Sequence, residues 1–278
     1  MKQSKALCDK YPAAAATVIM DLTVEAEAFG AEIIFPENEV PSVSGRLLAD
    51  EAAIDALEIP ALNKGRIAQY LKANMLTAKN ITDRPVLAGC IGPYSLAGRL
   101  YDMSEIMMLI YINLEAANTL LHKCTDFIIR YCMALKATGV NGVVMAEPAA
   151  GLLSNEDCLQ YSSVFVKEIV EKVQDDHFTV VLHNCGNTGN CTQAMVYTGA
   201  AAYHFGNKIN MEEALKEEFD DAFHICYVNV DENKDIVEAC HVQGIPVVAV
   251  YKGGKEVQRF NGERDYDDVC DFLDQTLA

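Results

Sequence analysis

Short apolar runs that alternate with helix-forming stretches limit the fold of this chain more than any other feature of its sequence. The strand-like runs lie at residues 85–93, 139–148, 177–185 and 200–205, and Gly or Pro stands at or next to their ends. Near-continuous apolar strands separated by helices are typical of a parallel sheet covered on both faces. We therefore expect an α/β fold of the (β/α)-barrel type, which takes roughly 250 residues when complete. The repeating region ends near Glu218 of 278 residues, so we expect a truncated barrel or one that the following segment completes.

Helices are predicted between and before these strands. Residues 103–136 are rich in Leu, Met, Ala and Glu and contain neither Pro nor Gly, which favours a helix. Ser154 is followed closely by two acidic residues and should begin a helix that runs to about Val173, and residues 192–198 suit another. The apolar stretch 12–20 is too short to cross a bilayer and an acidic segment follows it, so we predict a buried helix there.

Composition narrows the class of protein and its partners. Hydrophobic residues make up 51% of the chain, which is enough for a folded core. The formal net charge of −18 argues against nucleic acid or an anionic membrane surface as the principal partner. The amino-terminal apolar stretch lacks the features of a signal peptide, so a cytoplasmic location is expected. The ten cysteines are too sparse for a compact disulfide framework and suit a reducing compartment.

The sequence VVLHNCGN at residues 180–187 places an imidazole and a thiol two residues apart, next to a glycine. In a strand, side chains at positions i and i+2 point to the same side. His183 and Cys185 can therefore project together from the carboxyl end of a strand, where many α/β enzymes have their sites. A nitrogen and a sulfur so placed form part of a zinc-ligand set, although a core histidine beside a loop cysteine would give the same pattern.

Three further polar residues lie near the ends of predicted strands. Glu147 follows the preceding strand and could be a metal ligand, a hydrogen-bond acceptor for His183, or a solvated carboxylate. Asn187 could hold the motif loop through its amide or simply form a turn. His204, at the end of the next strand, could face the same end of the sheet. The candidate catalytic residues are therefore Glu147, His183 and Cys185, and the candidate substrate-binding residues are Asn187 and His204.

Five stretches of the sequence carry a resemblance to a known family. They are LTVEAEAFGA at 22–31, EVPSV at 39–43, GPYSLA at 92–97, EPAAGLLS at 147–154 and HNCGNT at 183–188. With these stretches the chain resembles the uroporphyrinogen decarboxylase superfamily, and specifically its cobamide-dependent methyltransferase branch, which includes methylcobamide:coenzyme M methyltransferases. The last stretch is the most specific, because true uroporphyrinogen decarboxylases lack the His-x-Cys pair. The resemblance covers residues from about 21 to 215.

The resemblance implies a metal and two substrates. In that family the His-x-Cys pair binds zinc together with a further cysteine from near the end of the barrel, so His183 and Cys185 are implied as metal ligands here. Zinc lowers the pKa of a bound thiol and so holds a small thiol substrate as a thiolate at neutral pH. That thiolate takes the methyl group of a methylcobamide, which a corrinoid protein can carry. The protein's part is to position the two partners and to exclude water.

The two ends of the chain depart from the family pattern. The segment before Asp21 is shorter than in the family, and after about Phe219 the expected Gly-Cys pair and proline-rich turn are missing. The missing cysteine leaves the third metal ligand open among Cys191, Cys226, Cys240 and Cys270.

The segment after residue 218 resembles the second half of a thioredoxin fold. Residues 223–234 begin this half, Ile245-Pro246 takes the position of a cis-proline, and KGGK at 252–255 reads as a hairpin turn. We therefore expect a barrel at 1–218 and a thioredoxin-like segment at 219–278. The chain contains no Cys-x-x-Cys, which disfavours a dithiol–disulfide activity.

Three functions remain in competition at this point. Zinc-dependent methyl transfer between a methylated corrinoid and a thiol is the leading hypothesis. The alternative is a catalytically degenerate relative that binds a corrinoid or a partner, which the short start and the missing cysteine favour. Uroporphyrinogen decarboxylation ranks below both. It needs arginines and an aspartate near the amino end to hold and protonate its substrate, and this chain lacks that part of the family pattern.

Overall fold

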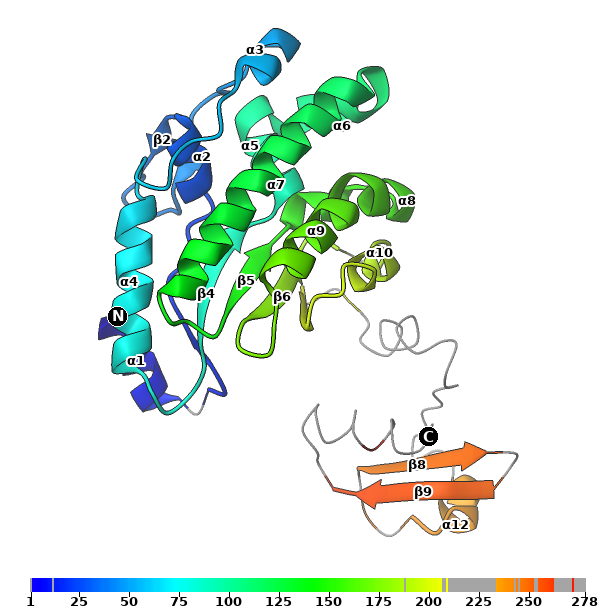
Figure 1. The fold of residues 1–278 in the computed structure, drawn as a ribbon. Helices are drawn as coiled ribbons and strands as arrows, with labels where there is room; N and C mark the ends of the chain where they lie inside the picture. The colour runs from blue at the N-terminus through cyan, green and yellow to red at the C-terminus, as the bar shows by residue number, and fades with distance from the viewer. Residues whose placement is uncertain are drawn as a thin grey trace. The chain divides into compact units, whose positions relative to one another are not determined.

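Five parallel strands form the sheet that organises the amino-terminal part of the molecule (Figure 1). The computed structural model describes residues 2–11, 13–187, 189–206, 209, 234–242, 244, 246–252, 255–262 and 272. The chain divides into two compact units, Met1–Glu218 and Phe219–Ala278.

The strands follow one another across the sheet in the order in which they occur in the chain. They are β1 (Ala16–Thr17), β4 (Val86–Ile91), β5 (Gly142–Ala146), β6 (Thr179–Asn184) and β7 (Ala202–Phe205), all parallel to their neighbours. A short antiparallel hairpin, β2 (Ile33–Ile34) with β3 (Ser42–Val43), lies between β1 and β4 in the chain. This arrangement confirms an α/β fold with a parallel half-barrel. Five strands do not close a barrel, which takes about eight.

Helices connect the strands and precede the first of them. Before β4 lie α1 (Lys2–Lys10), α2 (Val24–Phe29), α3 (Glu51–Ala56) and α4 (Ile67–Asn80). Between β4 and β5 lie α5 (Pro93–Tyr101), α6 (Met103–Ile112) and α7 (Leu114–Ala137). Between β5 and β6 lie a 3₁₀ turn (Pro148–Leu152), α8 (Asn155–Cys158), a π-helical turn (Leu159–Ser163) and α9 (Val164–Val173), and α10 (Thr192–Val196) precedes β7.

Burial along β6 shows which face of the sheet the helices cover. Val180 and Leu182 are buried, whereas Val181 and His183 between and after them are only half-buried. Helices α7 and α9 pack against each other, α7 also packs on β4 and β5, and Figure 1 shows both helices over the same side of these strands. Within the described ranges the opposite face is therefore partly open, in contrast to the sheet covered on both faces that the apolar strands predict. A half-barrel lacks the strands that would face its inner side in a closed barrel.

The helix predicted for residues 12–20 is wrong. Ala16 and Thr17 instead form β1, which pairs with Val86 and Leu87 of β4. The backbone N–H groups of Ala16 and Val18 donate to carbonyl oxygens of the β4 segment. This pairing satisfies the backbone and buries Ala16 and Val18, and so it outweighs the helix preference of the alanines.

The long helix predicted for residues 103–136 is present but broken in two. Asn113 ends α6 with an extended φ of −148°, and its Oδ1 accepts a hydrogen bond from the backbone N–H of Ala116. Asparagine competes well for backbone hydrogen bonds at such ends. The helix predicted from Ser154 to Val173 also forms, with Ser154 as its N-cap and a π-helical turn within it.

The second unit contributes one helix and one hairpin to the described residues. Helix α12 spans Lys234–Ala239, and β8 (Val247–Lys252) pairs antiparallel with β9 (Lys255–Asn261). Lys252 pairs with Lys255, which confirms the hairpin at KGGK. Ile245 of the predicted cis-proline bond and residues 223–233 of the predicted thioredoxin-like segment lie outside the described residues. The thioredoxin-like architecture therefore stays a prediction.

No helix in the described part of the chain is long and apolar enough to cross a membrane.

Candidate functional site

His183 and His204 lie side by side at the carboxyl ends of β6 and β7. They are register partners in this parallel pair, so their side chains point to the same face of the sheet. The ring centroids are 4.7 Å apart. Nδ1 of His183 lies 2.6 Å from Nδ1 of His204 and 3.1 Å from the backbone oxygen of His204. The structure thus brings two of the predicted site residues together on the partly open face.

The environment of His183 favours a neutral ring. Burial lowers the pKa of His183 below its ordinary value, and the charge that His204 can carry lowers this pKa further. A neutral imidazole is the form that coordinates metals and accepts protons.

Cys185 lies in the turn directly after β6. The strand ends at Asn184, whose Oδ1 accepts hydrogen bonds from the backbone N–H groups of Gly186 and Asn187. The Cys185 side chain is exposed. Because the extended backbone stops before Cys185, strand alternation no longer determines whether its sulfur lies beside His183. Within the described part of the chain, no group of three or more His, Cys, Asp or Glu residues is placed to hold a metal ion.

Asn187 organises the loop that follows the motif. Its side chain is buried. Its Oδ1 accepts hydrogen bonds from the backbone N–H groups of Gly189 and Cys191, and its Nδ2 donates to Oγ1 of Thr192 at 3.3 Å. In this geometry the amide shapes the loop and does not face the open side of the sheet.

The motif loop packs directly on the turn that follows β5. A Cβ atom built on Gly151 would lie 2.2 Å from the carbonyl carbon of Gly186, and one built on Gly186 would lie 2.3 Å from the carbonyl oxygen of Pro148. Only glycine allows two backbones to approach this closely. The turn after β5 therefore packs directly against the backbone of Gly186, the residue that follows Cys185.

Glu147 follows β5 and directs its side chain to the start of α5. Its Oε1 accepts a hydrogen bond from the backbone N–H of Ser95, and its Oε2 has no hydrogen-bond partner among the described residues. The contact with His183 is made by the backbone N–H of Glu147, which donates to the carbonyl oxygen of His183. Burial raises the pKa of Glu147 to about 8, so the carboxyl is mostly protonated at neutral pH.

Glu25 is a second buried carboxyl at the same end of the sheet, and the sequence interpretation did not identify it as a site residue. Its Oε1 accepts a hydrogen bond from the backbone N–H of Ile91, the last residue of β4. Burial raises the pKa of Glu25 to about 7. One feature of the sequence could have identified Glu25 as a buried carboxyl. It stands between two apolar residues, Val24 and Ala26, both of which are buried in α2.

Of the four cysteines proposed as a third ligand, Cys191 alone lies among the described residues of the first unit. Cys191 is buried, and its thiol donates to the carbonyl oxygens of Ala150 and Leu153 and is hydrogen-bonded to Cys158. Cys240 belongs to the second unit, and Cys226 and Cys270 lie outside the described residues.

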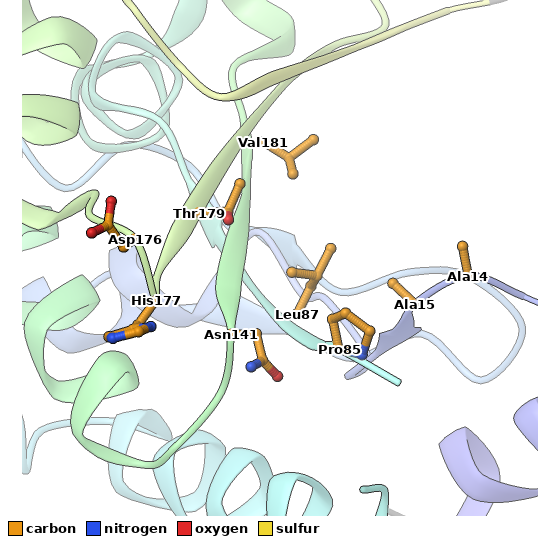
Figure 2. Close-up of a pocket in the computed structure, with 9 residues that line it drawn as sticks. All are labelled: Ala14, Ala15, Pro85, Leu87, Asn141, Asp176, His177, Thr179 and Val181. Carbon is orange, nitrogen blue, oxygen red and sulfur yellow. The ribbon is translucent and has the colours of Figure 1, made fainter. Parts of the chain in front are cut away.

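The hollow drawn in Figure 2 lies at the opposite end of the sheet. It has a volume of about 440 Å³. Pro85, Asn141 and Thr179 line it at the amino ends of β4, β5 and β6, whereas His183 stands near the carboxyl end of β6. Barrel enzymes place their chemistry at the carboxyl ends of the strands. The hollow is therefore not part of the candidate site.

Comparison with known proteins identifies the family of this chain. The family model "Uroporphyrinogen decarboxylase (URO-D)" matches residues 3–244. The match includes most of the first compact unit and extends past its end at Glu218. The methylcobamide:CoM methyltransferase MtbA of Methanosarcina mazei is 30% identical over 204 residues, which are 72% of this chain and 60% of that protein. A uroporphyrinogen decarboxylase of Legionella pneumophila is 26% identical over 200 residues, 69% of this chain and 56% of that protein.

A solved structure supports the fold. A methyltransferase from Methanosarcina mazei superposes with a TM-score of 0.72 at 24% identity, covering 88% of this chain and 76% of that chain. The chain spans about 60% of the length of the methyltransferase relative that it matches. Because the family model covers most of the sequence, the chain belongs to the uroporphyrinogen decarboxylase family.

Proposed function

We propose that this protein transfers a methyl group between a methylated corrinoid and a thiol, with zinc held by His183 and Cys185. The observation that carries the proposal is the pair of imidazoles at the carboxyl ends of β6 and β7, with a thiol in the turn that follows. The similarity to a methylcobamide:CoM methyltransferase supports it.

The donor chemistry suits zinc, which accepts imidazole nitrogen and thiolate sulfur and normally takes three or more protein ligands. His183 offers a neutral ring, and Cys185 offers an accessible sulfur. A third protein ligand is not among the described residues near them. Cys191, Cys226, Cys240 and Cys270 stay the candidates for the third ligand. When bound, the metal would lower the pKa of a thiol substrate enough to keep it ionised.

The reaction requires little covalent chemistry from the protein. The thiol loses its proton to solvent, its sulfur forms a bond to the methyl carbon, and the electron pair of the carbon–cobalt bond returns to the corrinoid. The protein then has to align sulfur, carbon and cobalt and exclude water. The substrates proposed are a small thiol, with coenzyme M suggested by the relative's name, and a methylcobamide that is free or carried by a corrinoid protein.

The other side chains of the site have supporting roles in this proposal. Glu147 is not proposed as a metal ligand, because its carboxyl is buried at Ser95 and mostly protonated at neutral pH. Asn187 holds the loop that carries Cys185.

A catalytically degenerate relative that binds a corrinoid or a partner is the second candidate. The absence of a group of three metal-binding side chains from the described residues favours it. Uroporphyrinogen decarboxylation is less well supported, even though relatives carry that name. The methyltransferase relative is more similar to this chain, at 30% identity against 26% for the decarboxylase.

Metal analysis tests the zinc site. We expect about one equivalent of zinc in the purified protein, and at least tenfold weaker binding in His183→Ala and Cys185→Ser. His177→Ala and Cys8→Ser, which lie away from the motif, serve as matched controls and should bind as the parent does. Protein without zinc, with both motif variants behaving like the parent, would refute the proposed site.

A methyl-transfer assay separates the two candidate functions. Zinc-loaded protein is mixed with methylcobalamin and coenzyme M, and the loss of the methylcobalamin absorbance is followed. We expect turnover in the parent and a large loss in Cys185→Ser. Corrinoid binding without turnover, even with added zinc, would favour the degenerate relative.

A further inference from the structure

The contact between His183 and His204 determines which nitrogen of each ring carries hydrogen. Nδ1 of His183 lies within hydrogen-bond distance of the backbone oxygen of His204. A carbonyl oxygen only accepts hydrogen bonds, so Nδ1 of His183 must be the N–H donor. In a neutral ring the other nitrogen, Nε2, then carries the lone pair.

The same contact determines the state of the second ring. Nδ1 of His204 lies 2.6 Å from Nδ1 of His183. Because the hydrogen between them belongs to His183, Nδ1 of His204 must present its lone pair. The N–H of His183 is thus shared between two acceptors on one residue, the ring nitrogen and the backbone oxygen of His204.

We infer that His204 is a positioning residue that holds His183 in the Nδ1–H tautomer and leaves its Nε2 as the metal-binding atom. The zinc part of this inference rests on the proposed function, whereas the tautomer is a property of the metal-free protein. Histidine ligands commonly donate their second ring N–H to a carbonyl or carboxylate, which fixes the ring and raises its basicity. Loss of such a partner typically weakens metal binding by about 10- to 100-fold.

The short separation argues against the two Nδ1 atoms sharing one metal ion. Zinc–nitrogen bonds of about 2.0–2.1 Å at a tetrahedral angle hold two ligand nitrogens about 3.3 Å apart. The observed 2.6 Å lies well below that spacing and just under the usual range of a hydrogen bond donated by N–H. His204 therefore acts on the metal through His183.

The tautomer is tested by nitrogen-15 NMR of the histidine rings in zinc-free protein at neutral pH. We expect hydrogen on Nδ1 and a lone pair on Nε2 of His183. His204→Ala keeps the backbone oxygen but removes the ring acceptor, so the fraction of His183 with hydrogen on Nδ1 should fall without vanishing. His204→Asn should restore the parent state, because its side-chain oxygen can accept the same hydrogen bond. His177→Ala is the matched control, since this exposed histidine lies at the other end of β6. Hydrogen on Nε2 of His183 in the parent, or a His204→Ala spectrum like that of the control, would overturn the inference.

Zinc affinity, measured by competition with a chromogenic chelator, tests the consequence. His204→Ala should bind zinc about tenfold more weakly than His177→Ala. The loss should stay at the low end of the usual range, because the backbone oxygen of residue 204 remains as an acceptor. His204→Asn should recover most of the affinity. If both His204 variants lose as much affinity as His183→Ala, His204 is itself a ligand and the positioning role is refuted. If the parent binds no zinc, the proposed function fails, and the NMR result still decides the tautomer. The His204 ring is exposed, so these substitutions should not unfold the protein.

Discussion

Two carboxyl groups at the carboxyl end of the sheet are buried so deeply that ionising them would cost free energy. Glu25 and Glu147 each accept a backbone hydrogen bond through one oxygen, and the second oxygen of each has no partner among the described residues. Burial accounts for the raised pKa of both groups. A protonated carboxyl is the less costly form in such a place.

The raised pKa of Glu147 predicts a pH-dependent stability. The folded protein keeps the proton up to about pH 8, whereas the unfolded chain releases it near the ordinary glutamate pKa of 4.5. The free energy of unfolding should therefore fall as pH rises through this window, by at most about 1.4 kcal/mol per pH unit for this group. Glu147→Gln should show a shallower fall when urea unfolding is measured between pH 5 and 8.

The control is Glu156→Gln, which changes an exposed carboxyl on α8. It should keep the pH dependence of the parent. An unchanged slope in Glu147→Gln would mean that Glu147 is ionised in the folded protein.

The sequence predicts some of these residues better than others. Placing His183 at a strand end follows from the apolar run before it, and His204 is likewise placed at the end of the next strand. The register that pairs the two histidines is seen only in the structure. The direction of the Glu147 side chain does not follow from any local pattern. It depends on Gly92, where an added Cβ would lie 1.6 Å from Oε2 of Glu147.

At the scale of elements, the site depends on close packing between the loop after β6 and the turn after β5. The motif loop and the turn after β5 approach so closely that Gly151 and Gly186 leave no room for a side chain. The hydrogen bonds from Asn184 and Asn187 then define the path of the loop.

Gly151→Ala should therefore disturb the loop that carries Cys185. The added methyl group meets backbone atoms, which cannot rotate away, and overpacking of this kind costs about 1–3 kcal/mol. Urea unfolding should show this loss, and the zinc affinity should fall with it.

Gly244→Ala is the comparison, because no atom of the described residues lies within 4 Å of a Cβ atom at that position. Its stability should stay within about 0.5 kcal/mol of the parent. If Gly151→Ala matched it in both stability and zinc affinity, the two connections would not support each other as described.

Element prediction succeeded where the sequence pattern was strong and failed where pairing decided the outcome. The strands at β4, β5, β6 and β7 and the long helical regions follow from glycine and proline boundaries and apolar runs. The stretch 12–20 was misassigned because its alanines favour a helix, while its partner strand lies about 70 residues away in the sequence, at Val86. The end of β6 at Asn184, one residue before Cys185, could not be read from the motif either.

At the scale of the whole molecule, the parallel half-barrel belongs to a family whose matched methyltransferase member is longer. Its partly open face carries the two imidazoles at its carboxyl end. Within the described residues, no group of three metal-binding side chains accompanies them. The sequence predicts the two donors proposed here, His183 and Cys185, because strand position and residue type suffice for that. It leaves the third proposed donor open, because no local pattern points to it.

X-ray absorption at the zinc edge, with and without a small thiol, tests the central claim most directly. Zinc–sulfur bonds of about 2.3 Å are readily distinguished from zinc–nitrogen bonds of about 2.0 Å. We predict a mixed nitrogen and sulfur shell that loses sulfur in Cys185→Ser and gains one sulfur when the thiol is added to the parent protein. A shell of nitrogen and oxygen alone that the thiol leaves unchanged would contradict zinc-activated methyl transfer.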